Sequence, residues 1–512
     1  MIEENKSSMK NSVRRLIIAG IGVLIQIIWV VVLVMRLNQY SQIITLLTVA
    51  IELVLVLAVY SMDTNAAFKL PWIILITVAP IVGICVFFLF GRSGATKKVR
   101  ARYRKIDQQL FAYLNQDEQI IDELSKKDER LANDFKYLWK CASSPVYKNT
   151  DVKYYGDTCD AMAAQLEDMM QAKKFIFLEY HAIEMAESFQ ALRKVLMAKA
   201  REGVEIRILY DDAGCIGFLN PRFIKYMESM GIQCRVFNPI MPVLNIFMNN
   251  RDHRKITGID GRVAYTGGYN LADEYFNITH PYGQWKDSGI RFEGDAVQTA
   301  TILFLEMWNA LREQDVDIEK YLPVYPYKAK EQGFFALYGD SPLDKEPAGE
   351  NVYMNLLRHA KKYIYFTTPY LILSDEMTRE LTGAAKRGVD VRIITPGIPD
   401  KKTIFQVTKS YYPQLLKHGV KIYEYTPGFM HEKQCICDGE IVVVGTINLD
   451  FRSLYLHFEN AALFCGYEAV SHVKEDFDAL FPICKDMSKE PSERTRRLRL
   501  SQLILRLFSP LM

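Results

Sequence analysis

The sequence predicts an α/β protein built from two similar halves, with membrane-spanning helices in front of them. Three observations lead to this fold class. The pattern His-x-Lys-x4-Asp occurs at His253 and again at His431, the strand and helix patterns around the two copies repeat, and the first part of the chain contains long apolar runs. The chain has only eight histidines, so one frame is not expected to occur twice by chance. The two copies therefore indicate a duplicated site.

Residues 1–106 are expected to form a membrane region. Crossing a bilayer takes about 20 apolar residues, and three segments approach this length: 16–35, 43–60 and 70–90. Gln26 is the only strongly polar residue of the first, Glu52 interrupts the second, and Pro80 lies within the third. A cleaved signal peptide is the alternative for the first segment. Its apolar run is longer than the roughly 7 to 15 residues of a signal peptide, and no small-x-small cleavage site follows it.

Basic residues flank the membrane region on both sides. One cluster precedes it, Lys6, Lys10, Arg14 and Arg15, and a larger one follows it, Arg92, Lys97, Lys98, Arg100, Arg102, Arg104 and Lys105. Because basic residues favour the cytoplasmic side, three full spans cannot leave both clusters there. Either one segment is interfacial or re-entrant, or one cluster is translocated. The larger cluster leads us to expect a multi-pass protein of the cell membrane with a cytoplasmic catalytic part, which nine scattered cysteines also favour.

The two halves are expected to span residues 107–320 and 321–488. Two pairs of segments resemble each other: Lys173–Tyr180 with Lys361–Thr368, and Lys199–Ile208 with Ala384–Ile393. In each half, short β-branched and aromatic runs alternate with helical stretches, which predicts an α/β layer structure with parallel strands. Gly203 and Gly388 would each follow a helix, where a positive φ costs little.

The repeated residues suit phosphate-ester chemistry without a metal or cofactor. A histidine can attack phosphorus, and a second histidine can protonate the leaving alkoxide and deprotonate the incoming alcohol. A lysine two positions on lies on the same face of a strand, where its ammonium can bind phosphate oxygens. The candidate catalytic residues are those of the two motifs, and the candidate substrate-binding residues are the asparagines that follow: His253, Lys255, Asp260, His431, Lys433 and Asp438, with Asn270 and Asn448.

Four carboxylates near the motifs are expected to divide into two roles. Asp260 and Asp438 are each followed by glycine, the pattern of a hairpin turn, and we expect them to tie strands together. Asp287 and Glu459 are expected to orient the histidines, each following the histidine of its own half. The other histidines are expected to be structural, although His181 follows a predicted strand and is also a candidate for lining the pocket.

The paired motifs resemble those of the phospholipase D superfamily, and the apolar N-terminus followed by two such halves is similar to the bacterial cardiolipin synthases. Ile364–Tyr370 is similar to a strand end of that family, and Leu89–Arg92 to its membrane exit, whereas segment 16–35 is an addition. The resemblance implies mixed sheets flanked by helices in a pseudo-twofold module. It also implies transfer of a phosphatidyl group from one phosphatidylglycerol to another, giving cardiolipin and glycerol, with His253 as nucleophile and His431 as acid and base.

Residues 489–512 are expected to form a basic amphipathic helix. Leu500, Leu503, Ile504 and Leu507 make one apolar stripe with arginines around it, as in helices on anionic lipid. A helix that packs this stripe on its own domain is the alternative. A net charge of +3 argues against a nucleic-acid binder. The remaining rivals are a hydrolase that makes phosphatidic acid, a membrane-tethered nuclease or other phosphodiesterase, a phosphatidylserine synthase and a non-catalytic lipid-binding scaffold.

Overall fold

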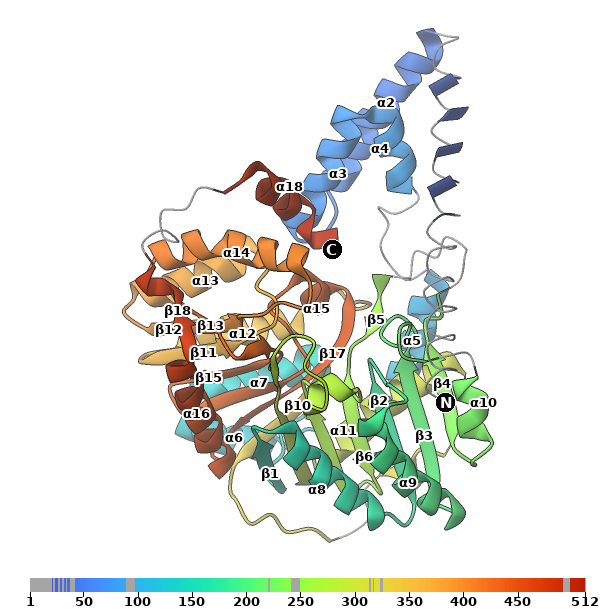
Figure 1. The fold of residues 1–512 in the computed structure, drawn as a ribbon, viewed down its shortest axis with the longest axis vertical. Coiled ribbons are helices and arrows are strands. Elements are labelled where there is room, and N and C mark those ends of the chain that lie inside the picture. Colours follow the sequence, from blue (N-terminus) through green and yellow to red (C-terminus); the bar gives the residue numbers. More distant parts are fainter. Residues whose placement is uncertain are drawn as a thin grey trace.

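The computed structural model describes residues 42–88, 97–219, 222–240, 249–312, 315, 317–322, 326–490 and 498–511, with nine scattered positions between 21 and 36. Most of the apolar segment predicted at 16–35 lies outside the described residues. The described chain folds into two α/β halves that lie side by side, with apolar helices projecting from one end (Figure 1). The predicted mixed α/β architecture is confirmed.

The first half contains a sheet with the strand order β1-β9-β7-β6-β2-β3-β4 among the described residues. Its strands are β1 (Thr150–Tyr155), β2 (Phe175–Tyr180), β3 (Glu205–Asp211), β4 (Gln233–Phe237), β6 (Lys255–Ile259), β7 (Val263–Gly267) and β9 (Gly289–Gly294). Its helices are α8 (Thr158–Met170), α9 (Glu187–Arg201), α10 (Phe223–Glu228) and α11 (Val297–Leu311). Strands β2, β3 and β4 are parallel as predicted, whereas β6, β7, β9 and β1 run antiparallel to their neighbours.

The second half repeats this order as β10-β17-β16-β15-β11-β12-β13, with β18 added at the edge. Its strands are β10 (Phe334–Asp340), β11 (Tyr363–Thr367), β12 (Asp390–Pro396), β13 (Lys421–Tyr425), β15 (Gln434–Cys437), β16 (Ile441–Gly445), β17 (His457–Cys465) and β18 (Cys484–Asp486). Its helices are α12 (Ala348–His359), α13 (Asp375–Lys386), α14 (Lys402–Lys417), α15 (Phe451–Tyr455) and α16 (Glu468–Leu480). Gly203 and Gly388 have φ of 86° and 94° after α9 and α13, as predicted.

Two short parallel bridges join the halves. Strand β5 (Arg251–Asp252) of the first half pairs with the start of β17, and β14 (Gly428–Met430) of the second half pairs with β8 (Gln284–Lys286) of the first. A buried apolar cluster also contains residues from both sheets, among them Ile256 and Ile436. The halves therefore form one packed module with the two motif segments at its centre.

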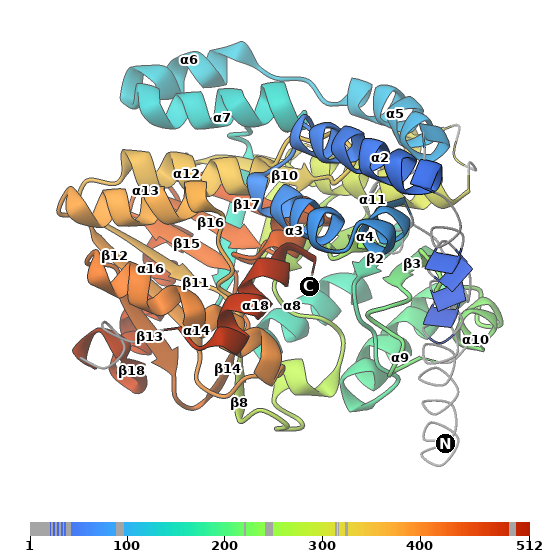
Figure 2. The same cartoon turned by 90° about the horizontal axis from the view of Figure 1, so that it is seen from above.

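Three helices that precede β1 divide between the halves. Helix α5 (Lys97–Leu110) packs on α11, whereas α7 (Glu129–Ala142), which pairs with α6 (Glu118–Lys127), packs on β10 and α12. Figure 2 shows α6 and α7 above the second half and α5 above the first. The helices at the start of the module thus contact both halves, although all of them precede the first half in the sequence.

The N-terminal apolar helices are α2 (Gln42–Tyr60), α3 (Ala66–Val78) and α4 (Pro80–Val86). Segment 70–90, which was expected to cross the bilayer, does not form one helix but divides between α3 and α4. Pro80 opens α4, and Ala79 before it has φ −136° and ψ 73°, since a residue that precedes proline is driven out of the helical region. Among the described residues, none of the helices combines the length and apolar character that a bilayer crossing requires.

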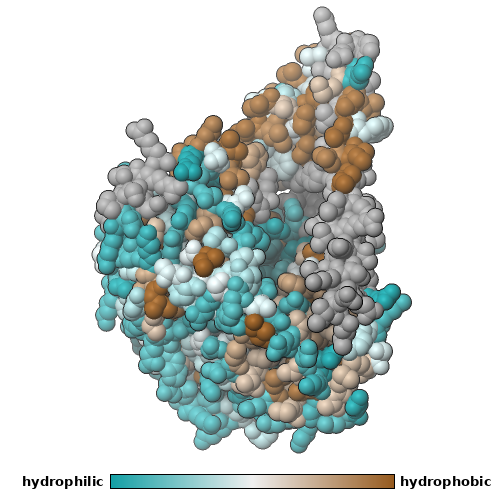
Figure 3. Space-filling view, viewed as in Figure 1, coloured by the Kyte–Doolittle hydropathy of each residue, from teal (hydrophilic) through white to brown (hydrophobic). Residues whose placement is uncertain are grey.

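Helices α2 and α3 expose many large apolar side chains, as Figure 3 shows at the projecting end of the molecule. Helix α18 (Leu500–Phe508) lies beside α14 and also contacts α3. Its residues Leu500, Leu503 and Ile504 are exposed, whereas Gln502 is buried against the protein. The predicted apolar stripe therefore faces outward, and the alternative in which it packs on its own domain is not what the structure has.

Candidate active site

The two strand bridges bring each motif histidine to a carboxylate of the other half. The backbone N–H of His253 donates to the carbonyl of Phe458, and that of His431 donates to the carbonyl of Lys286. Glu459 follows Phe458 and Asp287 follows Lys286, so each bridge sets a histidine of one half beside a carboxylate of the other. The site is thereby built across the interface.

The expected pairing within each half is wrong. His253 Nδ1 lies 2.8 Å from Glu459 Oε2, and His431 Nδ1 lies 2.5 Å from Asp287 Oδ2. Both carboxylates are fully buried, and Thr446 donates a further hydrogen bond to Glu459. Because Nδ1 of each ring faces a carboxylate, Nε2 is the nitrogen left for substrate.

The two motif lysines lie beside the histidines. Lys255 Nζ donates to the carbonyl of His253 at 2.7 Å, and Lys433 Nζ donates to the carbonyl of His431 and lies 2.8 Å from its Nδ1. Burial lowers the pKa of Lys255 to about 8 and that of Lys433 to about 7. Two ammonium groups are thus held close together inside the protein, where an anion would stabilise both.

Both histidines are kept neutral in the empty site. Burial and the charges of Lys255 and Lys433 hold the pKa of His253 well below its usual value. Burial and Lys433 lower the pKa of His431 to about 3, although Asp287 acts in the opposite direction. Burial alone would raise the pKa of Asp287, but His431 and Lys433 outweigh it and hold that pKa below its usual value.

A cavity of about 470 Å³ opens over these groups. Asn270 and Asn448 line it together with both histidines. The amide of Asn270 is fixed by the N–H of Ala182 and the hydroxyl of Tyr275, whereas Oδ1 of Asn448 is buried without a partner among the described residues. The sequence-predicted histidines and asparagines therefore meet in one cavity.

Sequence comparison assigns the chain to a family. Residues 166–308 and 353–481 match the family model for the cardiolipin synthase, PLD-like domain. The chain is 31% identical over 442 residues to cardiolipin synthase of Halalkalibacterium halodurans, covering 86% of this chain and 87% of that protein. The chain belongs to the cardiolipin synthase family. It is accordingly a phosphatidyltransferase of the phospholipase D type.

Two further proteins and one solved structure are similar to the chain over most of its length. The chain is 30% identical over 452 residues to cardiolipin synthase 2 of Bacillus anthracis, covering 86% of each protein. It is 39% identical over 460 residues to an uncharacterized protein of Streptococcus mutans, covering 90% of this chain and 99% of that protein. The crystal structure of phosphatidylserine synthase from Haemophilus influenzae superposes with a TM-score of 0.52 at 13% identity, covering 70% of this chain and 93% of that chain. At this identity the superposition concerns the fold alone.

Neither motif aspartate lines the catalytic cavity. The carboxylate of Asp260 accepts the backbone N–H groups of Lys173, Lys174 and Phe175 at 2.7 to 2.8 Å. Asp438 does the same for Lys361, Lys362 and Tyr363 in the second half. Both aspartates have positive φ in the turn that follows the motif strand. Each therefore ties its hairpin to the start of the neighbouring strand.

Replacing Asp438 with alanine is expected to lower stability more than catalysis. Three backbone donors would lose their acceptor, at a cost of about 1 to 3 kcal/mol. Chemical denaturation of Asp438→Ala measures this change, and activity per folded molecule should fall far less than in a histidine variant. Glu440→Ala, in the same turn but exposed, is the matched control and should change stability by less than about 0.5 kcal/mol. A folded Asp438→Ala that is as inactive as a histidine variant would give the aspartate a chemical role.

Several cavity residues have no motif to mark them. His181, a candidate for lining the pocket, and His457, which was expected to be structural, flank His253 with ring centroids 5.0 and 5.6 Å away. Tyr275 and Trp285 flank His431 in the same way, at 5.1 and 5.0 Å. For His457, the one sequence signal was its position two residues before Glu459.

One group of side chains among the described residues could hold a metal ion. Ligand atoms of His253, His457 and Glu459 all lie within 4.8 Å of one another. Two of these residues already form the histidine–carboxylate pair, so the cluster is accounted for by the hydrogen bond that orients His253.

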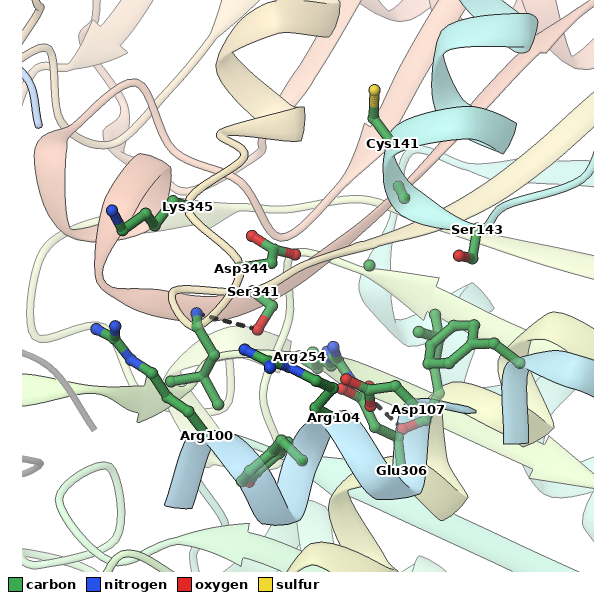
Figure 4. A pocket seen from close by; sticks show the side chains of 16 residues that line it. Arg100, Arg104, Asp107, Cys141, Ser143, Arg254, Glu306, Ser341, Asp344 and Lys345 are labelled. Carbon is green, nitrogen blue, oxygen red and sulfur yellow. Dashed lines mark hydrogen bonds and ion pairs between the residues drawn. The ribbon is translucent and has the colours of Figure 1, made fainter. Parts of the chain in front are cut away.

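A second cavity, of about 440 Å³, lies away from both motif histidines (Figure 4). Arg254, the middle residue of the first motif, lines it and pairs with Glu306 at 2.8 Å. Burial and the neighbouring Glu306 raise the pKa of Asp107 to about 8. Arg254 thus anchors β6 to α11 through Glu306. It does not line the catalytic cavity.

Proposed function

We propose that the protein makes cardiolipin by a two-step transfer through a phosphohistidine. The observation that carries this proposal is the pair of buried histidine–carboxylate contacts, made from opposite halves, whose histidines line one cavity and each lie beside a buried lysine. Such a site offers one nucleophile, one proton carrier and a cationic cradle. Phosphatidylglycerol is the proposed donor and acceptor.

In the first step, Nε2 of neutral His253 attacks the phosphorus of one phosphatidylglycerol. The bond from phosphorus to the glycerol oxygen breaks, and protonated His431 gives its proton to that oxygen. Glycerol leaves, and the phosphatidyl group stays on His253. Lys255 and Lys433 bind the phosphate oxygens as charge builds on them.

In the second step, neutral His431 takes a proton from a hydroxyl of a second phosphatidylglycerol. The hydroxyl oxygen attacks phosphorus, the bond between phosphorus and His253 breaks, and cardiolipin leaves. His431 thereby regains the proton that it gave to glycerol in the first step. The two steps together convert two phosphatidylglycerols into cardiolipin and glycerol.

The surroundings of the two histidines support this division of roles. A nucleophilic imidazole must be neutral, and burial with two nearby lysines disfavours the charged form of His253. A proton carrier must hold charge in turn, and the 2.5 Å contact with Asp287 favours the charged form of His431. A bound phosphate would favour protonation further by offsetting the lysine charges.

The rival hydrolase would use water as acceptor and release phosphatidic acid. The cavity wall near His431 contains Tyr275, Trp285 and Phe429, which suits a lipid acceptor better than free water. Purified protein incubated with phosphatidylglycerol in mixed micelles, with a chelator present, tests the choice. Cardiolipin with one released glycerol per cardiolipin supports the proposal, whereas phosphatidic acid alone moves the protein to the hydrolases.

The catalytic efficiency is expected to fall as pH rises through about 7 to 8. Lys433 and Lys255 lose their protons there in the empty enzyme, so the site attracts the phosphate less strongly. Stability should change in the opposite direction. In the folded state both lysine pKa values lie below the ordinary 10.5. Between the lowered pKa values and 10.5 the unfolded chain binds more protons than the folded protein, so stability rises with pH in that range.

A pH series of kcat/KM alongside thermal unfolding checks this prediction. Lys433→Arg keeps its charge throughout and should move the falling limb of kcat/KM to higher pH. Activity and stability that decline together with rising pH would instead indicate denaturation and would contradict the assignment of the limb to the lysines.

We also propose that the protein is bound to the cell membrane with the catalytic module on the cytoplasmic side. Exposed apolar side chains on α2 and α3 and the outward stripe of α18 support this. Arg506 of α18 stacks over Tyr411 at 4.0 Å, which holds the helix in place while the stripe remains free to enter lipid.

Tryptophan placed at position 503 is expected to enter the acyl layer. In Leu503→Trp protein mixed with phosphatidylglycerol vesicles, brominated acyl chains should quench the added fluorescence. Ile483→Trp, at another exposed apolar position outside α18, is the control and should not be quenched. Equal quenching at both positions, or none at 503, would remove α18 from the lipid contact.

A further inference from the structure

The two strand bridges occupy equivalent positions but differ in composition. On one bridge, Arg251 of β5 pairs with His457 of β17. At the equivalent positions of the other bridge, Phe429 of β14 pairs with Trp285 of β8. All four side chains line the catalytic cavity. The site is therefore symmetric in its histidines and lysines, but one of its walls is basic and the other aromatic.

A second arginine extends the basic wall. Arg452 of α15 also lines the cavity, and its Nε donates to Nε2 of His457 at 3.3 Å. Arg251 is 4% exposed and is fixed by the carbonyl of Asn238 at 2.9 Å and by Asp211 at 3.5 Å. Within the described part of the chain, Arg452 has no carboxylate at ion-pair distance.

The positive charge of Arg251 acts on the guanidinium group of Arg452. Burial lowers the pKa of Arg452, and the positive charge of Arg251 lowers it further, while Asp450 acts against both. An anion between the two arginines would offset their repulsion and the cost of burial. A guanidinium also matches phosphate oxygens with paired donors.

This basic wall lies close to the reacting group. The ring of His457 is 5.6 Å from the ring of His253, centroid to centroid, and Arg452 contacts the far nitrogen of His457. Arg452 is thus separated from His253 by the width of about one imidazole ring. The proposed transfer uses Lys255 and Lys433 for the donor phosphate, which leaves the two arginines of the cavity wall for a second anion.

We propose that Arg251 and Arg452, the latter held by His457, bind the phosphate of the acceptor lipid. The inference rests on the proposed function. An acceptor phosphatidylglycerol carries its own phosphodiester one glycerol away from the attacking hydroxyl, whereas water and simple alcohols carry none. The basic wall therefore selects an anionic lipid as acceptor, and cardiolipin with its two phosphates is the product that fits.

Competition between two acceptors tests the proposal. Purified full-length protein in mixed micelles receives phosphatidylglycerol together with ethanol, and cardiolipin and phosphatidylethanol are measured in the same sample. Arg452→Gln is expected to shift the product ratio about tenfold or more toward phosphatidylethanol, the loss expected when a charge-assisted hydrogen bond is removed. Arg452→Lys keeps the charge and should recover part of the ratio.

The matched control is Lys401→Gln, which removes one positive charge from the same cavity and should keep the wild-type ratio. The same shift in that variant would indicate a general charge effect and overturn the subsite. An equal fall of both products in Arg452→Gln, or an unchanged ratio, overturns it as well. Wild-type protein that makes phosphatidylethanol but no cardiolipin overturns both the subsite and the proposed function.

Discussion

Replacing either His253 or His431 with alanine is expected to reduce cardiolipin formation by at least about 10⁴-fold. The two residues act as one unit, and removing one member of such a unit costs nearly as much as removing both. Without His253 no phosphohistidine forms, and without His431 the glycerol oxygen leaves as an alkoxide. Release of labelled glycerol from phosphatidylglycerol measures the loss directly.

His472→Ala is the control for this loss, because His472 lies on the exposed surface of α16. It should keep wild-type turnover, and all three variants should unfold at similar temperatures. Substantial glycerol release by either motif variant would exclude the two-histidine mechanism.

Replacing either carboxylate with its amide is expected to slow cardiolipin formation less than removing a histidine does, but still by about 10²- to 10⁴-fold. Glu459→Gln and Asp287→Asn keep the shape of each side chain and remove the charge that orients a ring and stabilises its protonated form. Because the pairs cross between the halves, Glu459→Gln should impair the attack by His253 in the other half. Asp287→Asn should impair protonation by His431.

A donor with a good leaving group separates these two effects. A phosphatidyl ester of p-nitrophenol needs no proton from His431 in the first step, so Asp287→Asn should regain most of its lost rate in the first-turnover burst of p-nitrophenol. Glu459→Gln should stay slow, because the attack itself is impaired. Recovery by Glu459→Gln in place of Asp287→Asn would reverse the assigned roles of the two histidines.

The sequence allowed the duplicated fold to be predicted because the evidence for it is local. The strand and helix patterns, the glycines after α9 and α13 and the turns at Asp260 and Asp438 each depend on neighbouring residues. Those turns have the positive φ that the Asp-Gly pattern indicates. His253, His431, Asn270 and Asn448, which meet in the cavity, were predicted from the same repeated motif.

Contacts between the halves could not be predicted in this way. Glu459 and Asp287 each follow the histidine of their own half in the sequence, but two parallel bridges carry them to the opposite histidine. The basic wall has the same origin, because Arg251 and Arg452 are distant in sequence and carry no motif. The break between α3 and α4 could have been predicted, because Pro80 is a local signal. The apolar pattern around Pro80 obscured that signal.

Capture of the phosphatidyl group on the protein tests the central claim most directly. Wild-type protein is mixed with radiophosphorus-labelled phosphatidylglycerol, quenched rapidly in base, which preserves phosphohistidine, and digested. The label is expected on the peptide that contains His253, and it should disappear when unlabelled phosphatidylglycerol is added before the quench. Cardiolipin formation with no label on any histidine would show a single direct displacement and contradict the two-step transfer.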